Sequence, residues 1–114
     1  MPTPAFKPGE VIKVPFSYVD KPVRQYRPAL VVSSIAVTDG LGLLWVLMIT
    51  SAKNRSWPGD LEIADLERAG LPAASVVRCA KIATIESSAA TRIGELESAK
   101  YENIRTILRN SLKL

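Results

Sequence analysis

A chain of 114 residues can bury about two-thirds of the surface that its unfolded form exposes, so we expect one domain over residues 1–114 that needs no disulfide support. Fifteen lysines and arginines against eleven aspartates and glutamates give a net charge of +4 and a pI near 9.5, which favours polyanionic partners. The absence of histidine excludes enzymes that depend on imidazole as an acid, a base or a metal ligand.

Cysteine usage and hydropathy indicate where the protein works. Cys79 is the single cysteine, and the segment MPTPAFKPGE has neither the apolar region nor the cleavage site of a secretory signal. The most apolar stretch, Leu41 to Ile49, is far shorter than the roughly 20 residues of a helical membrane span. We therefore expect a cytoplasmic protein with no membrane partner. We expect Cys79 to be a small buried hydrophobe, because no histidine can activate it.

The first predicted strand runs from Gly9 to Phe16, where valine and isoleucine follow a Pro-Gly turn signal. Pro15 cannot donate a ladder hydrogen bond, which predicts that the end of this strand lies at a sheet edge or a bulge. The segment from Ser17 to Tyr26 has few apolar residues and contains proline, so it predicts an exposed loop.

Two nearly all-apolar strands follow, from Pro28 to Ile35 and from Gly42 to Thr50. The segment Thr38-Asp39-Gly40 between them predicts a hairpin connection, because Asp-Gly accepts a positive φ at little cost. Strands that are apolar on both sides predict either a sheet with two covered faces or a small closed barrel.

The second half begins with a polar loop and ends with a helix. The predicted elements are the loop Ala52 to Asp60, a short strand Leu61 to Ile63, a helical turn Asp65 to Ala69 stopped by Gly70, and a long strand Ser75 to Ile85. In the last segment, Tyr101, Ile104, Leu108 and Leu112 recur at helical spacing, with Ser98 as the predicted N-cap. Strands first and one long helix last predict a mainly β domain with a packed C-terminal α-helix.

An arginine and two hydroxyls occupy positions that suit a phosphate site. Arg27 stands at the start of one predicted strand, and Thr50 and Ser51 end the next. A guanidinium meets two phosphoryl oxygens with its forked donors, and hydroxyls can bind the same group. The alternatives are an edge arginine paired with a surface carboxylate, and hydroxyls that satisfy backbone groups at a strand end.

The order and spacing of several segments resemble the MazF/PemK family of toxins from type II toxin–antitoxin pairs, over nearly the whole chain. These segments are GEVIKVPF, YRPALVVS, LLWVLMITSAKN, WPGD and GLPAASVVRCAKIATIES. The resemblance implies an SH3-like β-barrel of the PemK/MazF/CcdB type with an appended helix, acting as a homodimer. It also implies an endoribonuclease that cuts single-stranded RNA without metal or cofactor. A cognate antitoxin would block it, and we expect that antitoxin to have an acidic, partly disordered tail.

The resemblance carries active-site roles to Arg27 and Thr50. A second family motif, V-V-R-C-D-Q, falls on Val76 to Lys81, so Arg78 is present as a third candidate catalytic residue, but Ala80 stands at the carboxylate position. If that carboxylate accepts the ribose proton in relatives, this chain uses another group, cuts more slowly or does not cut. Asp20 and Glu86 are the nearest carboxylates in sequence, although no motif matches them.

A basic and aromatic rim is the predicted contact surface for RNA. It comprises Lys21, Arg24, Ser51, Lys53, Arg55 and Trp57. Each cation alone also fits an ordinary solvated side chain. Trp57 fits either a platform for an unpaired base or an anchor for the Trp-Pro-Gly turn.

Two functions of other classes remain open at this level. The missing carboxylate allows a nucleic-acid-binding barrel that does not cut, and the similar CcdB fold allows a gyrase poison. The acidic residues Asp60, Glu62, Asp65 and Glu67 predict a solvated face, not a metal site, since no histidine or cysteine accompanies them.

Overall fold

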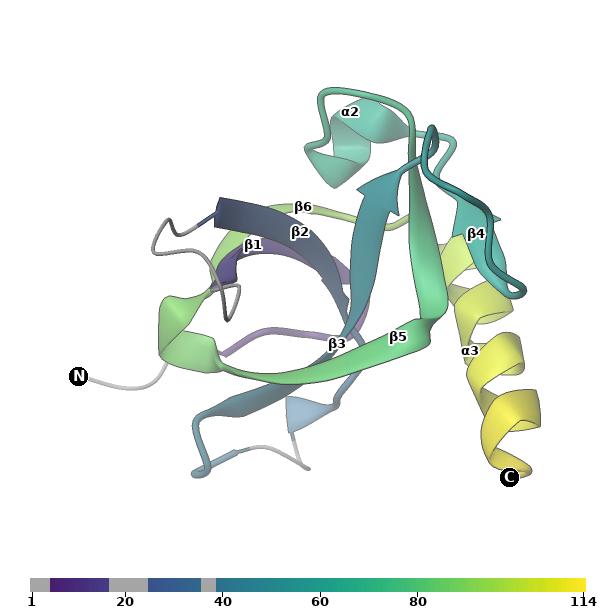
Figure 1. The fold of residues 1–114 in the computed structure, drawn as a ribbon. Helices are drawn as coiled ribbons and strands as arrows, with labels where there is room; N and C mark the ends of the chain where they lie inside the picture. The colour runs from purple at the N-terminus through teal and green to yellow at the C-terminus, as the bar shows by residue number, and fades with distance from the viewer. Residues whose placement is uncertain (1–4, 17–24, 36–38) are drawn as a thin grey trace.

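The structure is a computed structural model that describes residues 5–16, 25–35 and 39–114. These residues form one six-stranded sheet in the order β4-β5-β3-β2-β1-β6, with antiparallel neighbours throughout. The strands are β1 (Glu10–Phe16), β2 (Gln25–Val31), β3 (Leu43–Ser51), β4 (Asp60–Glu62), β5 (Ser75–Glu86) and β6 (Thr91–Glu95). The helices are α2 (Leu66–Ala69), the 3-10 turn η1 (Ser87–Ala89) and α3 (Ser98–Leu112). Figure 1 shows the sheet strongly curled, with α3 beside β4 and β5 and α2 near one end of the curl.

The sheet curls without closing. Its edge strands are β4 and β6, and no pairing among the described residues joins these two edges. Of the two arrangements that the apolar strands predicted, the structure therefore has the covered faces and not the closed barrel. The mainly β fold with a C-terminal helix is confirmed.

Successive residues of the central strands point into two separate buried clusters, one on each face of the sheet. The helix-side cluster contains Val11, Leu30, Leu47, Ile49 and Val77 with Ile104 of α3 and Ala69 of α2. The Phe6 cluster contains Ile12, Val14, Ala29, Val31, Leu44, Val46 and Met48 with Phe6. Each fully buried large aliphatic side chain stabilises the fold by roughly 1.5–3 kcal/mol. Burial on both faces explains why these strands lack a polar side.

The strand boundaries differ from the predictions in two places. β2 begins at Gln25 and ends at Val31, and beyond its end the Ser33 hydroxyl accepts a hydrogen bond from the backbone N–H of Trp45. Ile35, predicted in that strand, is exposed. In the connection to β3, Gly40 has a φ of 80°, as the hairpin prediction requires, while Thr38 lies outside the described residues.

Strand β6 was not predicted, and its place in the sheet explains the expected behaviour of Pro15. β6 pairs with β1 only over Glu10 to Lys13, with a register shift after Val11. Pro15 therefore lies past the end of β6, on a side of β1 where no described strand pairs, and the predicted edge position is confirmed.

The helix ends test three capping predictions. Asp65 accepts a hydrogen bond from the Arg68 backbone N–H at 3.1 Å, and Gly70 ends α2 with a φ of 72°, as predicted. The Ser98 cap is wrong: Glu97 is the N-cap residue, without a side-chain capping bond, and Ser98 is the first helical residue. Ile104 is buried, but Leu112 at the end of the apolar stripe is exposed. No helix within the described ranges is both long and apolar enough to cross a membrane.

Candidate functional site

Arg27 and Thr50 each lie two residues beyond the last paired residues of β2 and β3. The ladder pairs Val31 with Val46, Leu30 with Leu47 and Ala29 with Met48, and then stops. Continuing the same register by two residues sets Arg27 against Thr50. Because side chains alternate along a strand, both residues point to the face that carries Ala29 and Met48.

A cleft opens where β2 and β3 part. β2 remains paired with β1 as far as Gln25, and β3 remains paired with β5 as far as Ser51 and Ser75, so the two strands diverge beyond Ala29 and Met48. The cleft has a volume of about 320 Å³ and is lined by Tyr26, Arg27, Pro28, Ile49, Thr50, Ser51, Asn54 and Ser75. Three residues predicted from the sequence, Arg27, Thr50 and Ser51, are thus brought together. Their roles in binding and catalysis stay predictions.

The hydroxyl groups of the cleft have different partners. The Asn54 side-chain amide donates to the Thr50 hydroxyl oxygen at 2.6 Å. The Ser51 hydroxyl oxygen accepts from the Lys53 backbone N–H at 3.2 Å, so Ser51 serves the backbone at a strand end. The Ser75 hydroxyl donates to the Ala73 carbonyl at 2.8 Å. Among the described residues, Thr50 is thus the hydroxyl that accepts from another side chain of the cleft.

Arg78 lies one row of the sheet behind the cleft. Thr50 pairs with Val76, and the next pair on the same face is Met48 with Arg78, which in turn pairs with Asp60 of β4. Arg78 does not line the cleft among the described residues.

The Arg78 guanidinium makes three hydrogen bonds and one contact with an aromatic ring. It donates to both carboxylate oxygens of Asp60, at 3.2 and 3.1 Å, and to the Arg55 carbonyl at 2.6 Å. It also lies 4.1 Å from the centre of the Trp57 ring, within cation–π range. Both side chains of the ion pair are only 10% exposed. The structure thus has a salt-bridged Arg78, and its catalytic role stays a prediction.

The prediction of a solvated acidic face is wrong for Asp60, whose side chain is largely buried, and is confirmed for the exposed Glu62, Asp65 and Glu67. Hydrogen bonding from Arg78 is the main cause that holds the pKa of the Asp60 carboxyl below its usual value, against the opposing effect of burial. The predicted character of Cys79 is confirmed: the side chain is buried, and burial first, then the Asp60 charge, raises the pKa of its thiol.

The predicted rim is only partly described. Lys53 and Arg55 are exposed on the loop between β3 and β4. Lys21, Arg24 and the candidate carboxylate Asp20 lie outside the described residues. Glu86 pairs with Leu43, at the far end of β3 from Thr50, which removes it from the neighbourhood of this cleft.

Trp57 behaves in part as an anchor. Its ring contacts Arg78, its backbone N–H donates to Asp60 at 2.9 Å, and 39% of the residue is exposed. The turn-anchoring alternative therefore describes its contacts, and stacking of a base on its exposed part stays a prediction.

Sequence reasoning missed three residues of the cleft, Tyr26, Asn54 and Ser75. Tyr26 is 65% exposed, and the Lys13 ammonium lies 5.6 Å from its ring centre. Its position directly before Arg27 in the sequence could have indicated that it belongs to the site. Asn54 reaches the cleft through a local turn, and Ser75 through the pairing of β3 with β5. No local sequence pattern predicts that Asn54 and Ser75 line the cleft.

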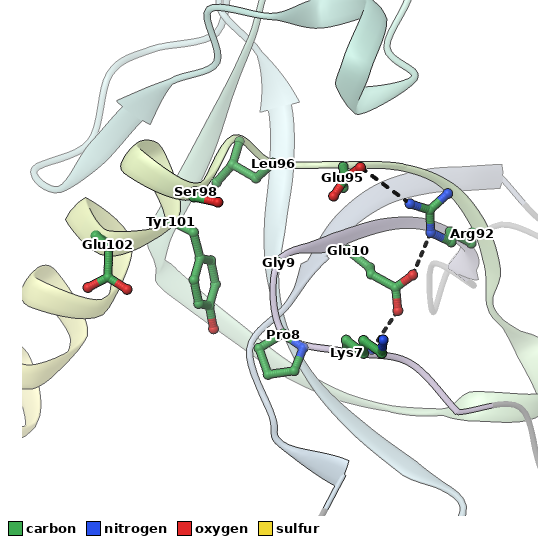
Figure 2. A pocket seen from close by; sticks show the side chains of 10 residues that line it. All are labelled: Lys7, Pro8, Gly9, Glu10, Arg92, Glu95, Leu96, Ser98, Tyr101 and Glu102. Carbon is green, nitrogen blue, oxygen red and sulfur yellow. Dashed lines mark hydrogen bonds and ion pairs between the residues drawn. The ribbon is translucent and has the colours of Figure 1, made fainter.

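A second hollow, of about 350 Å³, lies between the start of β1, β6 and the start of α3. Figure 2 shows Arg92 between Glu10 and Glu95 on one side of it, and Tyr101 and Glu102 on the other. The lining contains Glu10, Glu95 and Glu102 against Lys7 and Arg92, and Glu10 is already bonded to Arg92 and to the Lys7 backbone N–H. This hollow suits a polyanion less well than the cleft of Arg27.

Comparisons with known proteins identify the family and the fold of the chain. Residues 7–112 match the family model of the PemK-like, MazF-like toxin of type II toxin–antitoxin systems. No curated protein matches the chain significantly.

Several solved structures share the fold. The MazE–MazF complex of Deinococcus radiodurans matches with a TM-score of 0.73 and 21% identity, covering 95% of each chain. A mycobacterial endoribonuclease in complex with its cognate antitoxin matches with a TM-score of 0.72 and 20% identity, covering 100% of this chain and 97% of the other. The Mycobacterium tuberculosis toxin MazF-mt6 matches with a TM-score of 0.67 and 25% identity, covering 95% and 98%. Because the family model spans nearly all of the sequence and the fold agrees, the chain belongs to the PemK-like, MazF-like toxins of type II toxin–antitoxin systems.

Proposed function

We propose that the protein is a metal-independent endoribonuclease that cleaves single-stranded RNA and acts as the growth-arresting toxin of its pair. The observation that carries this proposal is the cleft that both Arg27 and Thr50 line, where β2 and β3 part. Both side chains line the same volume of about 320 Å³, and a phosphodiester is a group that a guanidinium and a hydroxyl bind together.

The chemistry requires little from the protein. The 2′-hydroxyl of RNA attacks the adjacent phosphorus, which needs a proton acceptor, donors for the phosphoryl oxygens and a proton for the leaving oxygen. Arg27 supplies forked donors to the phosphoryl oxygens, and the Thr50 hydroxyl donates to the same group. Arg78 is the second cation, acting from one row behind, where its bond to Asp60 limits its reach.

The family motif does not supply this chain with a group to accept the ribose proton. Ala80 occupies the position of the family's aspartate, and the described residues that line the cleft include no carboxylate. This observation favours one second candidate function, an RNA-binding barrel that holds its ligand without cutting it.

The relatives support a substrate and partners of this kind. The mycobacterial neighbour is an endoribonuclease bound to its cognate antitoxin, and the Deinococcus radiodurans neighbour is a MazE–MazF complex. By analogy we propose that this toxin acts as a cytoplasmic homodimer and that an antitoxin with an acidic tail covers the Arg27 cleft.

The purified protein is expected to cut a long unstructured RNA into discrete fragments in EDTA. Arg27→Ala should lower kcat/KM by about 10²–10³, because one preorganised donor to the transition state is worth that much. The matched control is Arg105→Ala, which removes an exposed arginine of α3 and should leave cleavage unchanged. Cleavage unaffected by Arg27→Ala would refute the assignment, and tight RNA retention without fragments would favour the binding barrel.

The loop cations are expected to set the salt dependence of RNA binding. Lys53→Ala and Arg55→Ala should each reduce the slope of log K against log salt by about 0.7, the value for one phosphate contact on a single strand. A 2′-O-methylated RNA that cannot be cut allows the affinity to be measured by fluorescence anisotropy. Arg109→Ala on α3 serves as the control, and an unchanged slope in the loop variants would show that they do not touch phosphates.

A further inference from the structure

The turn after β3 returns one side chain to the cleft. The Asn54 backbone N–H donates to the Ser51 carbonyl at 3.0 Å, and the Lys53 N–H donates to the Ser51 hydroxyl at 3.2 Å. These bonds fold the chain back so that the Asn54 amide reaches the Thr50 hydroxyl oxygen at 2.6 Å. Asn54 also lines the cleft, so its contact with Thr50 is made at the site itself.

The direction of this hydrogen bond decides what Thr50 can offer. A hydroxyl has one proton and two acceptor lone pairs. Because the oxygen accepts from Asn54, its own proton cannot point at that amide and is available to another acceptor. A threonine hydroxyl at a strand end otherwise tends to bond to nearby backbone groups, as Ser51 does here.

We infer that Asn54 is a positioning residue that aims the Thr50 proton into the cleft, toward a phosphoryl oxygen bound opposite by Arg27. The inference rests on the proposed function, since it concerns the same phosphate site. It assigns a part in the reaction to a residue of the β3–β4 loop for which the family resemblance implies no role. Asn54 touches Thr50 and not the reacting atoms.

Two substitutions of Asn54 test this hydrogen bond, one by removing the donor and the other by reversing the direction of the bond. Asn54→Ala removes the donor and should lower kcat/KM about tenfold, the effect of one modest hydrogen bond. Asn54→Asp keeps the shape but replaces the donor by an acceptor, which would take the Thr50 proton. Its kcat should fall by about 100-fold or more, because the phosphate then loses a donor and meets a negative charge.

The controls test charge and folding separately. Ser56→Asp places the same charge on the same loop, at an exposed residue that does not line the cleft, and should cost much less activity. Thermal unfolding of each variant shows whether the turn itself has been lost. The deciding experiment repeats Asn54→Ala in a Thr50→Val background, where no hydroxyl remains to be aimed.

The expected result is non-additivity: Asn54→Ala has no further effect once Thr50 is valine. An equal loss in both backgrounds would overturn the inference and make Asn54 a turn-forming residue only. The same double-mutant cycle is measured for affinity toward the 2′-O-methylated RNA. If the wild-type protein does not cut RNA, the proposed nuclease fails, whereas coupling in binding still supports the Asn54–Thr50 assignment and its absence still overturns it.

Discussion

Asp60→Ala is expected to lower the free energy of unfolding by about 3 kcal/mol, because it leaves the Arg78 guanidinium without its counter-charge in a site where the arginine is only 8% exposed. Two hydrogen bonds to the carboxylate and the bond from the Trp57 backbone are lost together. Urea denaturation followed by tryptophan fluorescence measures the change, provided that the slope with denaturant is unchanged.

The same pair makes stability depend on pH. The pKa of Asp60 is lowered in the folded state, chiefly by hydrogen bonding from Arg78, so the charged carboxylate stabilises the folded protein. This contribution is complete above the unfolded pKa of about 3.9 and is lost as pH falls through the lower folded value. Asp60→Ala should therefore lose less stability than the wild type between pH 5 and pH 2.

Two comparisons isolate the buried pair. Glu102→Ala breaks an exposed ion pair with Arg105 and should cost about 0.5 kcal/mol or less. Combining Asp60→Leu with Arg78→Met removes both charges and should recover much of the loss, since the penalty comes from the uncompensated charge. If Asp60→Ala proves no worse than Glu102→Ala, the pair does not hold the loop between β3 and β4 in place.

Gly94→Ala is expected to destabilise the protein by about 3 kcal/mol or more, because a methyl group at this position has no space. A Cβ there would stand 2.3 Å from the Ala69 carbonyl carbon and 2.5 Å from the carbonyl oxygens of Ala69 and Arg68. All three atoms belong to the backbone of α2, so no side-chain rotation relieves the clash. Either β6 or α2 must shift, which disturbs the helix-side cluster through Ala69. Thermal and urea unfolding measure the loss.

A glycine in open space provides the matched control. Gly40 has a φ of 80°, and no described atom lies within 4 Å of the place that a Cβ would take, so Gly40→Ala should cost only the backbone strain of about 1 kcal/mol. A similar cost for both substitutions would mean that α2 and β6 separate easily.

Local sequence patterns were sufficient to predict most of the strands and two residues of the candidate site, Arg27 and Thr50. The positions of β1, β3 and β5 follow from apolar runs and turn residues, and Asp65 and Gly70 mark the ends of α2. Their positions at strand ends and the family motif predicted that these two residues belong to one phosphate site, and in the structure both line the same cleft.

Other features depend on partners that are distant in the sequence. β6 has little strand character of its own, and its register comes from β1 and from the close approach of Gly94 to α2. Nothing near Arg78 in the sequence indicates that Asp60 will neutralise it, because the two residues meet only through the pairing of β4 with β5.

By itself, the sequence determined the family, the mainly β class and the arginine and threonine of the proposed phosphate site, because these depend on residue types and short-range spacing. Only the tertiary structure decided that the sheet stays open, that Arg78 is bound to Asp60 and that Asn54 approaches Thr50. The physical reason is that strand register and the Arg78–Asp60 pair depend on contacts between segments distant in the sequence, and that the turn from Ser51 to Asn54 is one of several conformations open to a polar loop. The local chain leaves those choices nearly equal in free energy.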